Sequence, residues 1–576
     1  MPRSVSRLLC EMTQCGRRPR KRGKAMFGQR EWHRAAVATL LVCLGTQASF
    51  AAVTGRISGT VKDPTGAVVP SADVTALETQ TGIRNATKTD VQGFYSFPSL
   101  PVGHYELEVR SSGFKDYKQT GLILDVNTAL LVDVPLQIGE ASQEVTVNAA
   151  AVQVETTNTH MGEVISDTKM TTVPLNGRSY TDLLALQPGV TPTSSGQYGA
   201  MSVSGDLNPG SLSVAGQRES TNAFMVNGGN VVEGGYMGTA IIPNLDSIAE
   251  FRILTNNADA EYGNYSGGQI NAITKSGTNE FHGDVFEFLR NTDLDARNFF
   301  SPDKGKFIQN QFGGTVGGRI IRDKLFFFSD YQGSRKIIGA STGNILVPTP
   351  ADRQGNLADI ADQMSGVVTG GYWANKLSQK LGYTVTQGEP YYTPGCTLNT
   401  TCVFPNAVIP QSAITTPSQN LLKYIPAANS GPFYSTSQFN QTLRDDKGSF
   451  RIDYNSRFGL ISGYYFLDDF TFDDPYGGAS IPGFTVSTLG RAQMANIADT
   501  KTFGPTAVNE LRVHYMRMVN LGGFPSGGPG TTLDSLGFVT GPSTLGIVVQ
   551  NKAAEGVPSI GFNNFSIGVN PYFGGN

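Results

Sequence analysis

The second half of the chain alternates apolar with polar or small residues at a period of two, and this pattern limits its fold more than any other feature. In the stretch 311–320, one face of an extended strand carries Phe312, Gly314, Val316, Gly318 and Ile320. The opposite face carries Gln311, Gly313, Thr315, Gly317 and Arg319. A strand of this kind lies between an apolar and a polar environment. The same pattern recurs at 450–455 and 511–515. We therefore expect antiparallel strands throughout this half.

The connections between these strands are very unequal in length. A tight turn at 455–457 returns directly into the next strand, whereas the connection at 334–444 is long. Short turns on one side and long loops on the other are typical of β-barrels that cross an outer membrane. A soluble sandwich with one wetted face is the alternative, and it does not explain this asymmetry. We interpret 279–576 as part of a transmembrane antiparallel β-barrel, with loop 334–444 outside the cell.

The composition agrees with a mostly β protein. Glycine is abundant at 68 residues, and the 32 Phe and 21 Tyr contrast with only 2 Trp. Glycine and aromatic residues suit many strands joined by turns. Charged residues make up 16% of the chain and the net charge is −3, so electrostatics gives no reason to expect a nucleic-acid partner.

The N-terminal residues, 1–52, have the organisation of a secretory signal. The apolar run 35–44 follows two arginines and precedes the small residues at 48–52. This run is too short to cross a bilayer, which needs about 20 residues. The basic stretch 17–24 lies upstream of the run and would be removed with it, and Met26 is an alternative start to Met1. We therefore expect an exported protein.

The cysteines agree with export. Three of the five lie in the signal region, which leaves Cys396 and Cys402 in the long loop. Six residues apart in a loop of an exported protein, they are expected to form one local disulfide. Two free thiols or a metal site are poorer interpretations, because no histidine or further cysteine lies near. A short helix is also expected in this loop, near 352–364.

The first folded unit, residues 53–139, reads as short strands between Gly, Pro and Asp turns. Tyr105, Leu107 and Val109 alternate with polar neighbours, which predicts a small sandwich of about seven strands. Its motifs GRISGTVKDPTGAVVPSADVTA, TDVQGFYSFPSLPVGHYELEV and SGFKDY resemble the carboxypeptidase regulatory-like domain. The resemblance implies a non-catalytic, prealbumin-like β-sandwich, often grouped with carbohydrate-binding folds. No aromatic platform commits this copy to sugar.

Residues 160–278 carry polar, glycine-rich motifs with mixed α and β signals. From this region onward, four motifs resemble the plug and first barrel strands of the Oar-like subgroup of TonB-dependent transporters: VPLNGRSYTDLLALQPGV, SVAGQRESTNAFMVNGG, IPNLDSIAEFRILTNNADAEYGNYSGGQINAITKSGTNEFHGDVFEFLRN and NQFGGTVGGRIIRDKLFFFSDYQGSR. The resemblance implies a small α/β plug at 160–278. Its signature contains Asn176 and Gly177, which would form a turn, and Arg178, which would face the barrel wall. Asp246 is expected to cap a short helix.

The resemblance also gives a role to residues 140–159. They include a short β-prone stretch, EASQEVTVNAA, of the kind that adds as a strand to the sheet edge of a partner. This stretch looks like the TonB box, which pairs with the TonB-type periplasmic energy-coupling protein. A linker strand belonging to the plug or the sandwich is the alternative. The residues of the box would be Gln143, Glu144, Val145, Thr146 and Val147.

The number of strands is too small for the barrel of such a transporter. These barrels close with about 22 strands, each of about 9–11 residues. After the long loop is subtracted, the residues beyond 280 accommodate about six to nine strands. We therefore expect the chain to be truncated within an incomplete barrel.

The sequence offers little for catalysis. His160 and Glu163 have the spacing of a zinc carboxypeptidase pair, and His282 is a conceivable third ligand. In those enzymes the regulatory-like domain follows the catalytic domain, whereas here it comes first. We expect no catalytic residue, no metal and no cofactor.

Four aspartates are expected to crowd one turn near the middle of the barrel. Such a turn is usually a solvated acidic loop, and binding of calcium is the alternative. The four are Asp468, Asp469, Asp473 and Asp474.

Together these features predict a TonB-dependent receptor in the outer membrane of a Gram-negative-type cell, surrounded by outer-membrane lipid. Its function would be to import a bulky nutrient, such as a glycan or a metal chelate. Adhesion or export without energy-coupled import is the alternative. The substrate-binding residues cannot be read from the sequence.

Overall fold

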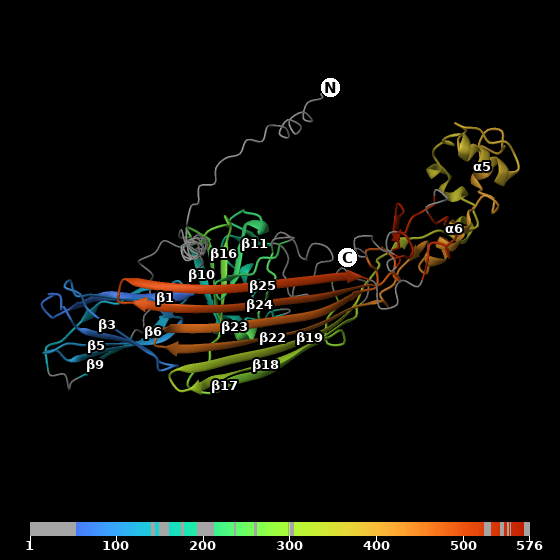
Figure 1. Ribbon diagram of the computed structural model, residues 1–576. Coiled ribbons are helices and arrows are strands. Elements are labelled where there is room, and N and C mark those ends of the chain that lie inside the picture. The colour runs from blue at the N-terminus through green and yellow to red at the C-terminus, as the bar shows by residue number, and fades with distance from the viewer. Residues whose placement is uncertain are drawn as a thin grey trace, which may run out of the picture. The chain divides into compact units, whose positions relative to one another are not determined.

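Strands dominate the computed structural model of the protein (Figure 1). The residues that it describes are 53–139, 144–148, 161–173, 175, 178–192, 212–234, 238–258, 262–297, 299, 304–523, 531–541, 546–549, 552 and 555–568. The expected signal, 1–52, lies outside the described residues. None of the helices in this described part has the length and apolarity needed to cross a membrane.

The N-terminal unit is built from two sheets. In the first, β1 (Thr54–Lys62) pairs with β4 (Phe94–Pro101), β7 (Ala129–Leu131) and β8 (Val134–Pro135). The second has five strands in the order β3 (Arg84–Lys88), β2 (Asp73–Glu78), β5 (Gly103–Arg110), β6 (Asp116–Leu124) and β9 (Glu144–Asn148). This arrangement is the predicted β-sandwich.

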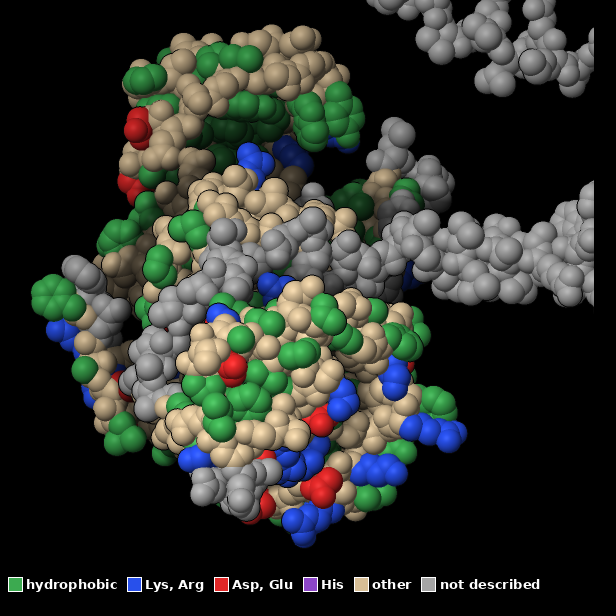
Figure 2. All heavy atoms as spheres, turned by 90° about the vertical axis from the view of Figure 1, so that its left-hand side faces the viewer, with side chains coloured by type: hydrophobic (Ala, Val, Ile, Leu, Met, Phe, Trp, Pro, Cys, Tyr) green, Lys and Arg blue, Asp and Glu red, His purple; other side chains and the backbone are tan. Residues whose placement is uncertain are grey.

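The sandwich core follows the predicted alternation. In β5, Tyr105, Leu107 and Val109 are buried, whereas Glu106 and Glu108 lie on the outer face and form ion pairs with cations of β6 and β3. On the face of the molecule drawn in Figure 2, positive and negative side chains are intermixed. The view therefore shows no large patch of one charge.

The plug contains a mixed five-stranded sheet in the order β10 (Met161–Ser166), β15 (Ile248–Asn256), β16 (Gln269–Thr274), β13 (Ala223–Val226) and β14 (Gly229–Asn230). Strands β13 and β16 are parallel, and the other pairs are antiparallel. Shorter elements surround the sheet. They are α2 (Asp167–Thr172), α3 (Thr181–Leu184), β11 (Val190–Pro192), β12 (Leu212–Val214), η1 (Glu219–Thr221) and η2 (Leu245–Ser247).

The barrel wall is a sheet of seven strands, each antiparallel to the next along the chain, which Figure 1 shows side by side. In order they are β17 (His282–Asn291), β18 (Phe307–Ile321), β19 (Leu325–Gly339), β22 (Asn440–Ser456), β23 (Gly459–Asp474), β24 (Val486–Phe503) and β25 (Ala507–Gly523). In the described residues, β17 and β25 do not pair with each other, so the barrel is incomplete. The strand number falls in the range expected from the sequence.

The two faces of this wall are reversed relative to a soluble sheet. Ile497 and Val513 are 60% and 62% exposed on the outer face, whereas Gln311 and Asp468 are 3% and 0% exposed on the inner face. An apolar outer face and a polar inner face are what a lipid-facing barrel requires. The predicted alternation of strand faces is confirmed.

The long loop between β19 and β22 is folded. It contains α4 (Pro350–Arg353), η3 (Ala358–Gln363), α5 (Gly371–Leu381), η4 (Pro405–Ala407), α6 (Thr416–Leu421) and η5 (Leu422–Tyr424), with the short pair β20 (Ile345–Leu346) and β21 (Phe433–Tyr434). The expected helix at 352–364 is therefore wrong as a single element, because the chain breaks it into α4 and the kinked η3. Thr349 caps α4 through reciprocal hydrogen bonds with Asp352.

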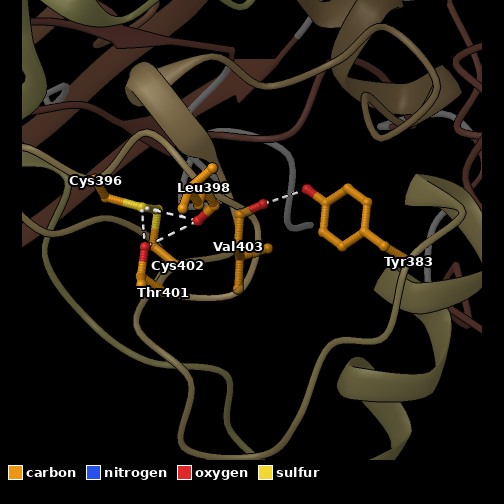
Figure 3. The surroundings of a disulfide bond; sticks show 6 residues. All are labelled: Tyr383, Cys396, Leu398, Thr401, Cys402 and Val403. Atoms are coloured by element: carbon orange, nitrogen blue, oxygen red, sulfur yellow. Dashed lines mark hydrogen bonds between the residues drawn. A yellow bond between two sulfur atoms is a disulfide. The ribbon is translucent and has the colours of Figure 1, made fainter.

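A disulfide joins Cys396 to Cys402 within this loop (Figure 3). Thr401 lies against the Cys396 sulfur, and the Tyr383 hydroxyl donates to the carbonyl of Val403 next to the bond. Val403 and Phe404 lie in a small apolar core with Val368, Ala374 and Val385. The disulfide and this core hold the tip of the loop together.

The base of the same loop packs against later parts of the chain. Ile345 and Ile425 share an apolar cluster with Ile481 and Leu536. Two further short strands, β26 (Ile560–Gly561) and β27 (Ser566–Ile567), contribute Ile567 to it. Loops that are distant in sequence therefore gather at this end of the strands.

We predict that Ile497→Arg destabilises the membrane-inserted protein by about 1–4 kcal/mol, because β24 would have to place a charge in lipid. Urea unfolding in bilayer vesicles measures the change. Val91→Arg, at a 77% exposed site of the sandwich, is the matched control and should cost less than about 0.5 kcal/mol. Equal, small effects of both substitutions would contradict a lipid-facing wall.

Candidate functional site

The segment that resembles a TonB box is a strand of the sandwich. Residues 144–148 form β9, which runs parallel to β6 with Val145 beside Tyr117 and Val147 beside Gln119. Gln143 lies outside the described residues. The sequence left open whether this stretch is a free coupling segment or a strand of a neighbouring domain. It lies in the sandwich sheet, and β9 is the last strand of that sheet.

Arg178 lies between the plug and the wall. Its guanidinium stacks over Phe286 and Phe288 of β17, at 4.6 Å and 4.2 Å from the ring centroids. It also forms an ion pair with Asp246 of the plug, and both side chains are nearly buried. A planar guanidinium can stack and pair at the same time, which a lysine cannot do as well. Asn176 and Gly177, the other signature residues, lie outside the described residues.

Asp246 therefore has a different role from the one expected. The short helix here is a single 3₁₀ turn, η2, which begins after Asn244, so Asp246 lies inside it instead of capping it. Its carboxylate is used as the partner of Arg178, 68 residues away in the sequence. The position of Asp246 among its sequence neighbours predicts a helix cap. It does not show that Arg178, from a distant part of the chain, lies next to this carboxylate.

Polar side chains of the wall hold the plug mainly through its backbone. Lys447 donates to the carbonyl oxygen of Ile242 at 3.3 Å, and Arg451 donates to that of Thr274 at 2.6 Å. Further along the wall, Asn496 donates to the carbonyl oxygen of Asn227 at 3.0 Å. Each neutral hydrogen bond contributes about 0.5–1.5 kcal/mol and each charged one about 1.5–3 kcal/mol. The plug is thus held by several hydrogen bonds of modest strength and not by one strong contact.

Side-chain contacts extend this polar interface. Asn244 and Ser449 both donate to the carboxylate of Asp330, which is 7% exposed. Ser276 of the plug donates to Asp453 at 2.6 Å. An apolar seam accompanies these contacts, because Phe466 and other wall residues belong to the same core cluster as the plug. The wall residues of this cluster are Tyr464, Phe466, Ala492 and Met494.

The four aspartates near 470 do not form a turn, so the expected acidic loop is wrong. All four lie in strand β23, where successive side chains point to opposite faces. Asp468 is fully buried beside Lys447 of β22, whereas Asp469 points outward and pairs with Arg491 at 2.5 Å. Asp473 accepts a hydrogen bond from Ser487 at 2.5 Å. The strand divides the four between two faces, so they make no calcium loop.

In the described part of the chain, the residues with carboxypeptidase-like spacing do not form a metal site. Glu163 lies in β10 and pairs with Lys169, and His282 lies at the start of β17 near Phe328. His160 is outside the described residues. Among those that are described, no group of His, Cys, Asp and Glu side chains has the geometry of a metal site.

A contact between the sandwich and the plug was not foreseen from the sequence. The amide of Val126 donates to the Glu250 carboxylate at 2.5 Å, and Arg252 donates to the carbonyl oxygen of Val126 at 2.8 Å. Glu250 and Arg252 lie on β15, which pairs with β10 and β16 in the plug sheet. All three residues are buried. We call this contact the Val126 clamp.

The Val126 clamp contains a titratable group. Burial raises the pKa of the Glu250 carboxyl to about 8, and the neighbouring Asp125 carboxylate adds to the rise. The Val126 amide and Arg252 act in the opposite direction. Because the folded pKa lies above the usual value of 4.5, the contribution of this group to stability is fully present below about pH 4.5 and is lost as the pH rises to about 8.

We predict that the clamp loosens progressively between about pH 4.5 and about pH 8, the usual and the folded pKa of Glu250, because this carboxyl must become charged in a buried position. Hydrogen exchange of residues 124–128 measures this loosening. The control is Glu250→Gln at each pH, which keeps a neutral side chain and cancels the chemical effect of pH on exchange. A wild-type protein that follows the glutamine variant at every pH would contradict the prediction.

We predict that Arg178→Ala destabilises the plug by about 2–4 kcal/mol, because it leaves the Asp246 carboxylate buried without its partner. Thermal unfolding and hydrogen exchange of β15 and β16 measure the loss. The double variant Arg178→Ala/Asp246→Asn should recover part of the stability, since it removes the lone charge. Strictly additive effects of the two substitutions would show that the pair is not coupled.

Comparisons with known proteins agree with this architecture. The sequence model of the family described as "Outer membrane beta barrel domain" matches residues 273–576, and that of the "Carboxypeptidase regulatory-like domain" matches residues 56–137. The second match confirms the resemblance noted in the first folded unit.

One curated relative is the TonB-dependent transporter Oar of Myxococcus xanthus, with 30% identity over 301 residues. The aligned part covers 49% of this chain and 27% of the relative, so the chain spans about a quarter of that protein's length.

Two solved structures show a partial likeness in fold. The outer membrane transporter YddB from Escherichia coli matches with a TM-score of 0.39 and 10% identity, over 63% of this chain and 39% of that one. The ferric enterobactin receptor PfeA from Pseudomonas aeruginosa matches with a TM-score of 0.33 and 14% identity, over 62% of this chain and 41% of that one. Scores this low carry no argument about function.

Proposed function

Because the chain belongs to the outer membrane β-barrel domain family, and is therefore a protein of the outer membrane, we propose that it acts as a TonB-dependent receptor that imports a bulky nutrient. A glycan or a metal chelate is the class of nutrient that we expect. The observation that carries the proposal is the plug sheet, which lies against the inner face of the wall through polar contacts and an apolar seam.

The plug makes import the better interpretation. A barrel that only anchors a surface protein needs no separate domain against its inner wall. Here the plug is held by contacts such as Lys447 with Ile242 and Asn496 with Asn227, each of which can be broken alone. A plug held in this way can shift when it is pulled, because no single contact carries the whole interface.

The partner in this proposal is a TonB-type periplasmic energy-coupling protein. It would engage the segment Gln143–Val147, of which β9 includes Glu144 to Val147. The Oar relative is named as a TonB-dependent transporter, which supports this choice of partner. We propose no enzymatic activity, and the Oar relative is a transporter.

Adhesion remains the second candidate, because the extracellular loop exposes aromatic side chains. Tyr372 and Trp373 at the start of α5 are 65% and 56% exposed, with ring centroids 5.2 Å apart. Exposed aromatic side chains are common where proteins bind other surfaces. The two functions make different demands on the coupling segment.

We predict that deletion of residues 143–149 abolishes uptake of the substrate while the protein still reaches the outer membrane. The physical reason is that the partner loses the strand on which it pulls. Uptake by whole cells and attachment to a surface are measured in parallel, with substitution of the exposed pair Tyr372→Ala/Trp373→Ala as the comparison. Unchanged uptake after the deletion would contradict energy coupling, and loss of attachment only in the aromatic variant would favour adhesion.

A further inference from the structure

One end of the sandwich contacts both the plug and the barrel wall. Glu78, the last residue of β2, pairs with Tyr105 of β5. Gly103, the first residue of β5, pairs with Leu124, the last residue of β6. The turn that leaves β2 and the segment that leaves β6 therefore lie at the same end. The segment after β6 forms the Val126 clamp with the plug, and the turn after β2 contacts the wall.

Asn279, which lies between the plug strand β16 and the first wall strand β17, holds this turn. Its backbone amide donates to the carbonyl oxygen of Gln80 at 3.0 Å, and its Nδ2 donates to that of Thr81 at 2.6 Å. The same Nδ2 donates to the Asp323 carboxylate at 2.6 Å, and its Oδ1 accepts from the Asp323 amide at 2.9 Å. Asp323 lies in the tight turn between β18 and β19. We call these contacts the Asn279 bracket.

The sequence of the turn after β2 suits this contact. The buried Glu78 carboxylate accepts hydrogen bonds from the amides of Gln80 and Thr81, at 3.2 Å and 2.5 Å. These bonds fix the turn, and the carbonyl groups of the same two residues bond to the bracket. Gly82 follows with a φ of +72°, and a Cβ at this position would overlap the Asp323 carboxylate. Glycine is therefore needed both for the left-handed conformation and for the close approach of the wall.

The plug, the wall and the sandwich are joined in a closed loop of contacts. The plug bonds to the wall directly, through several separate hydrogen bonds. The sandwich connects the same two parts by a second path, which begins at the Val126 clamp and ends at the Asn279 bracket. Asn127 adds a hydrogen bond to Tyr262 at the plug end of this path. The plug therefore moves away from the wall only if one end of the second path breaks as well.

We propose that the sandwich is a strap that holds the plug against the wall, and that it must let go at the bracket or at the clamp before the plug can move. This inference goes beyond the proposed import, because the restraint acts whether or not a partner pulls on the chain. It gives the regulatory-like domain a mechanical role that requires no ligand.

The weaker end of the strap sets the resistance of the whole path, because its two ends act in series. The bracket holds the sandwich by two hydrogen bonds between neutral groups, next to the exposed Asp323. The clamp is buried and includes the charged Arg252. Hydrogen bonds to charged groups contribute more than those between neutral groups, so we expect the bracket to open first.

The test measures opening of the plug–wall interface with a thiol probe. Ala492 of β24 is 1% exposed and belongs to the apolar cluster that the plug and the wall share. In the variant Ala492→Cys, a maleimide reacts at this position when the plug moves away, and mass spectrometry of the peptide around residue 492 gives the rate. Cys396 and Cys402 are joined in a disulfide and do not react. The whole chain is used in lipid vesicles, without a partner or a substrate.

We expect Asn279→Ala to raise the labelling rate about fivefold, which corresponds to the loss of about one neutral hydrogen bond. In the background Glu250→Ala/Tyr262→Phe, the same substitution should change the rate by less than about twofold, because the strap is already weakened at its plug end. The matched background is Glu250→Gln, which keeps an oxygen that can accept from the Val126 amide. There the effect of Asn279→Ala should again be about fivefold.

The same increase on Asn279→Ala in all three backgrounds would overturn the inference, because contacts that act independently have additive effects. An unchanged rate in the otherwise unmodified protein would overturn it too, since the bracket would then restrain nothing. Rapid labelling of Ala492→Cys before any further substitution would have the same meaning, because the plug would not be held against the wall.

Two further variants complete the comparison. Asn429→Ala is the matched control, because the Asn429 side chain also donates to one backbone group and accepts from another, both of Ser435 in the long loop. It should leave the rate unchanged, and an increase equal to that of Asn279→Ala would count against the strap. Gly82→Ala disturbs the bracket from the sandwich side, and it is judged by the same criteria if Asn279→Ala does not fold.

Discussion

The structure depends on the need to pair every backbone N–H and C=O group that faces lipid. Within a bilayer no water is present to bind an unpaired group, so strands that cross must be joined edge to edge by continuous ladders. Strands β17 to β25 meet this need at each edge that they share, with registers that run along nearly their whole length. Because the lipid-facing part of such a wall must be apolar, polar side chains in that part point inward, where they require partners.

The plug provides many of those partners. A wall residue such as Asp330 would be costly to bury alone, and it is satisfied by Asn244 of the plug and by Ser449 of the neighbouring strand. Arg451 and Asn496 are satisfied by plug carbonyl groups. Polar side chains that lipid excludes from the outer face therefore find hydrogen-bond partners in the plug, on the inner face. Since these contacts are separate and individually modest, the interface combines definite placement with the ability to rearrange.

Sequence patterns predicted the wall and the sandwich because both depend on local rules. The alternation at 450–455 and 511–515 depends only on the geometry of an extended strand, so it held when the strands were seen in place. The Gly, Pro and Asp turns of 53–139 likewise report local backbone conformation. The same rules failed for the aspartates near 470, since a run of Asp residues suggests a loop although β23 continues through it. Here the ladder with β22 and β24 outweighs the weak β propensity of aspartate.

The site was less predictable than the fold because its parts come from distant segments. The expectation that Arg178 faces the wall came from a resemblance, and nothing in its neighbourhood in the sequence identified Asp246, Phe286 and Phe288 as its contacts. Nor did any signal point to the Val126 clamp, in which a backbone group of the sandwich meets two side chains of β15. The one hint in the sequence was that Glu250 and Arg252 lie in a mostly apolar strand. Charged residues that are buried in such a strand need partners.

By itself, then, the sequence determined which segments are strands, which face of each is apolar, and that the chain combines a sandwich, a plug and part of a wall. The strands and their apolar faces follow from periodicity and turn chemistry, which act over a few residues, whereas the plug was inferred from the resemblance of its motifs to a known family. The tertiary structure decided which edges pair and which charges meet, including the placement of β9 on β6 and of Arg178 on Asp246. Pairing is a property of two segments at once, and the same five residues 144–148 would have the same local pattern whether they lay free, in the plug or in the sandwich.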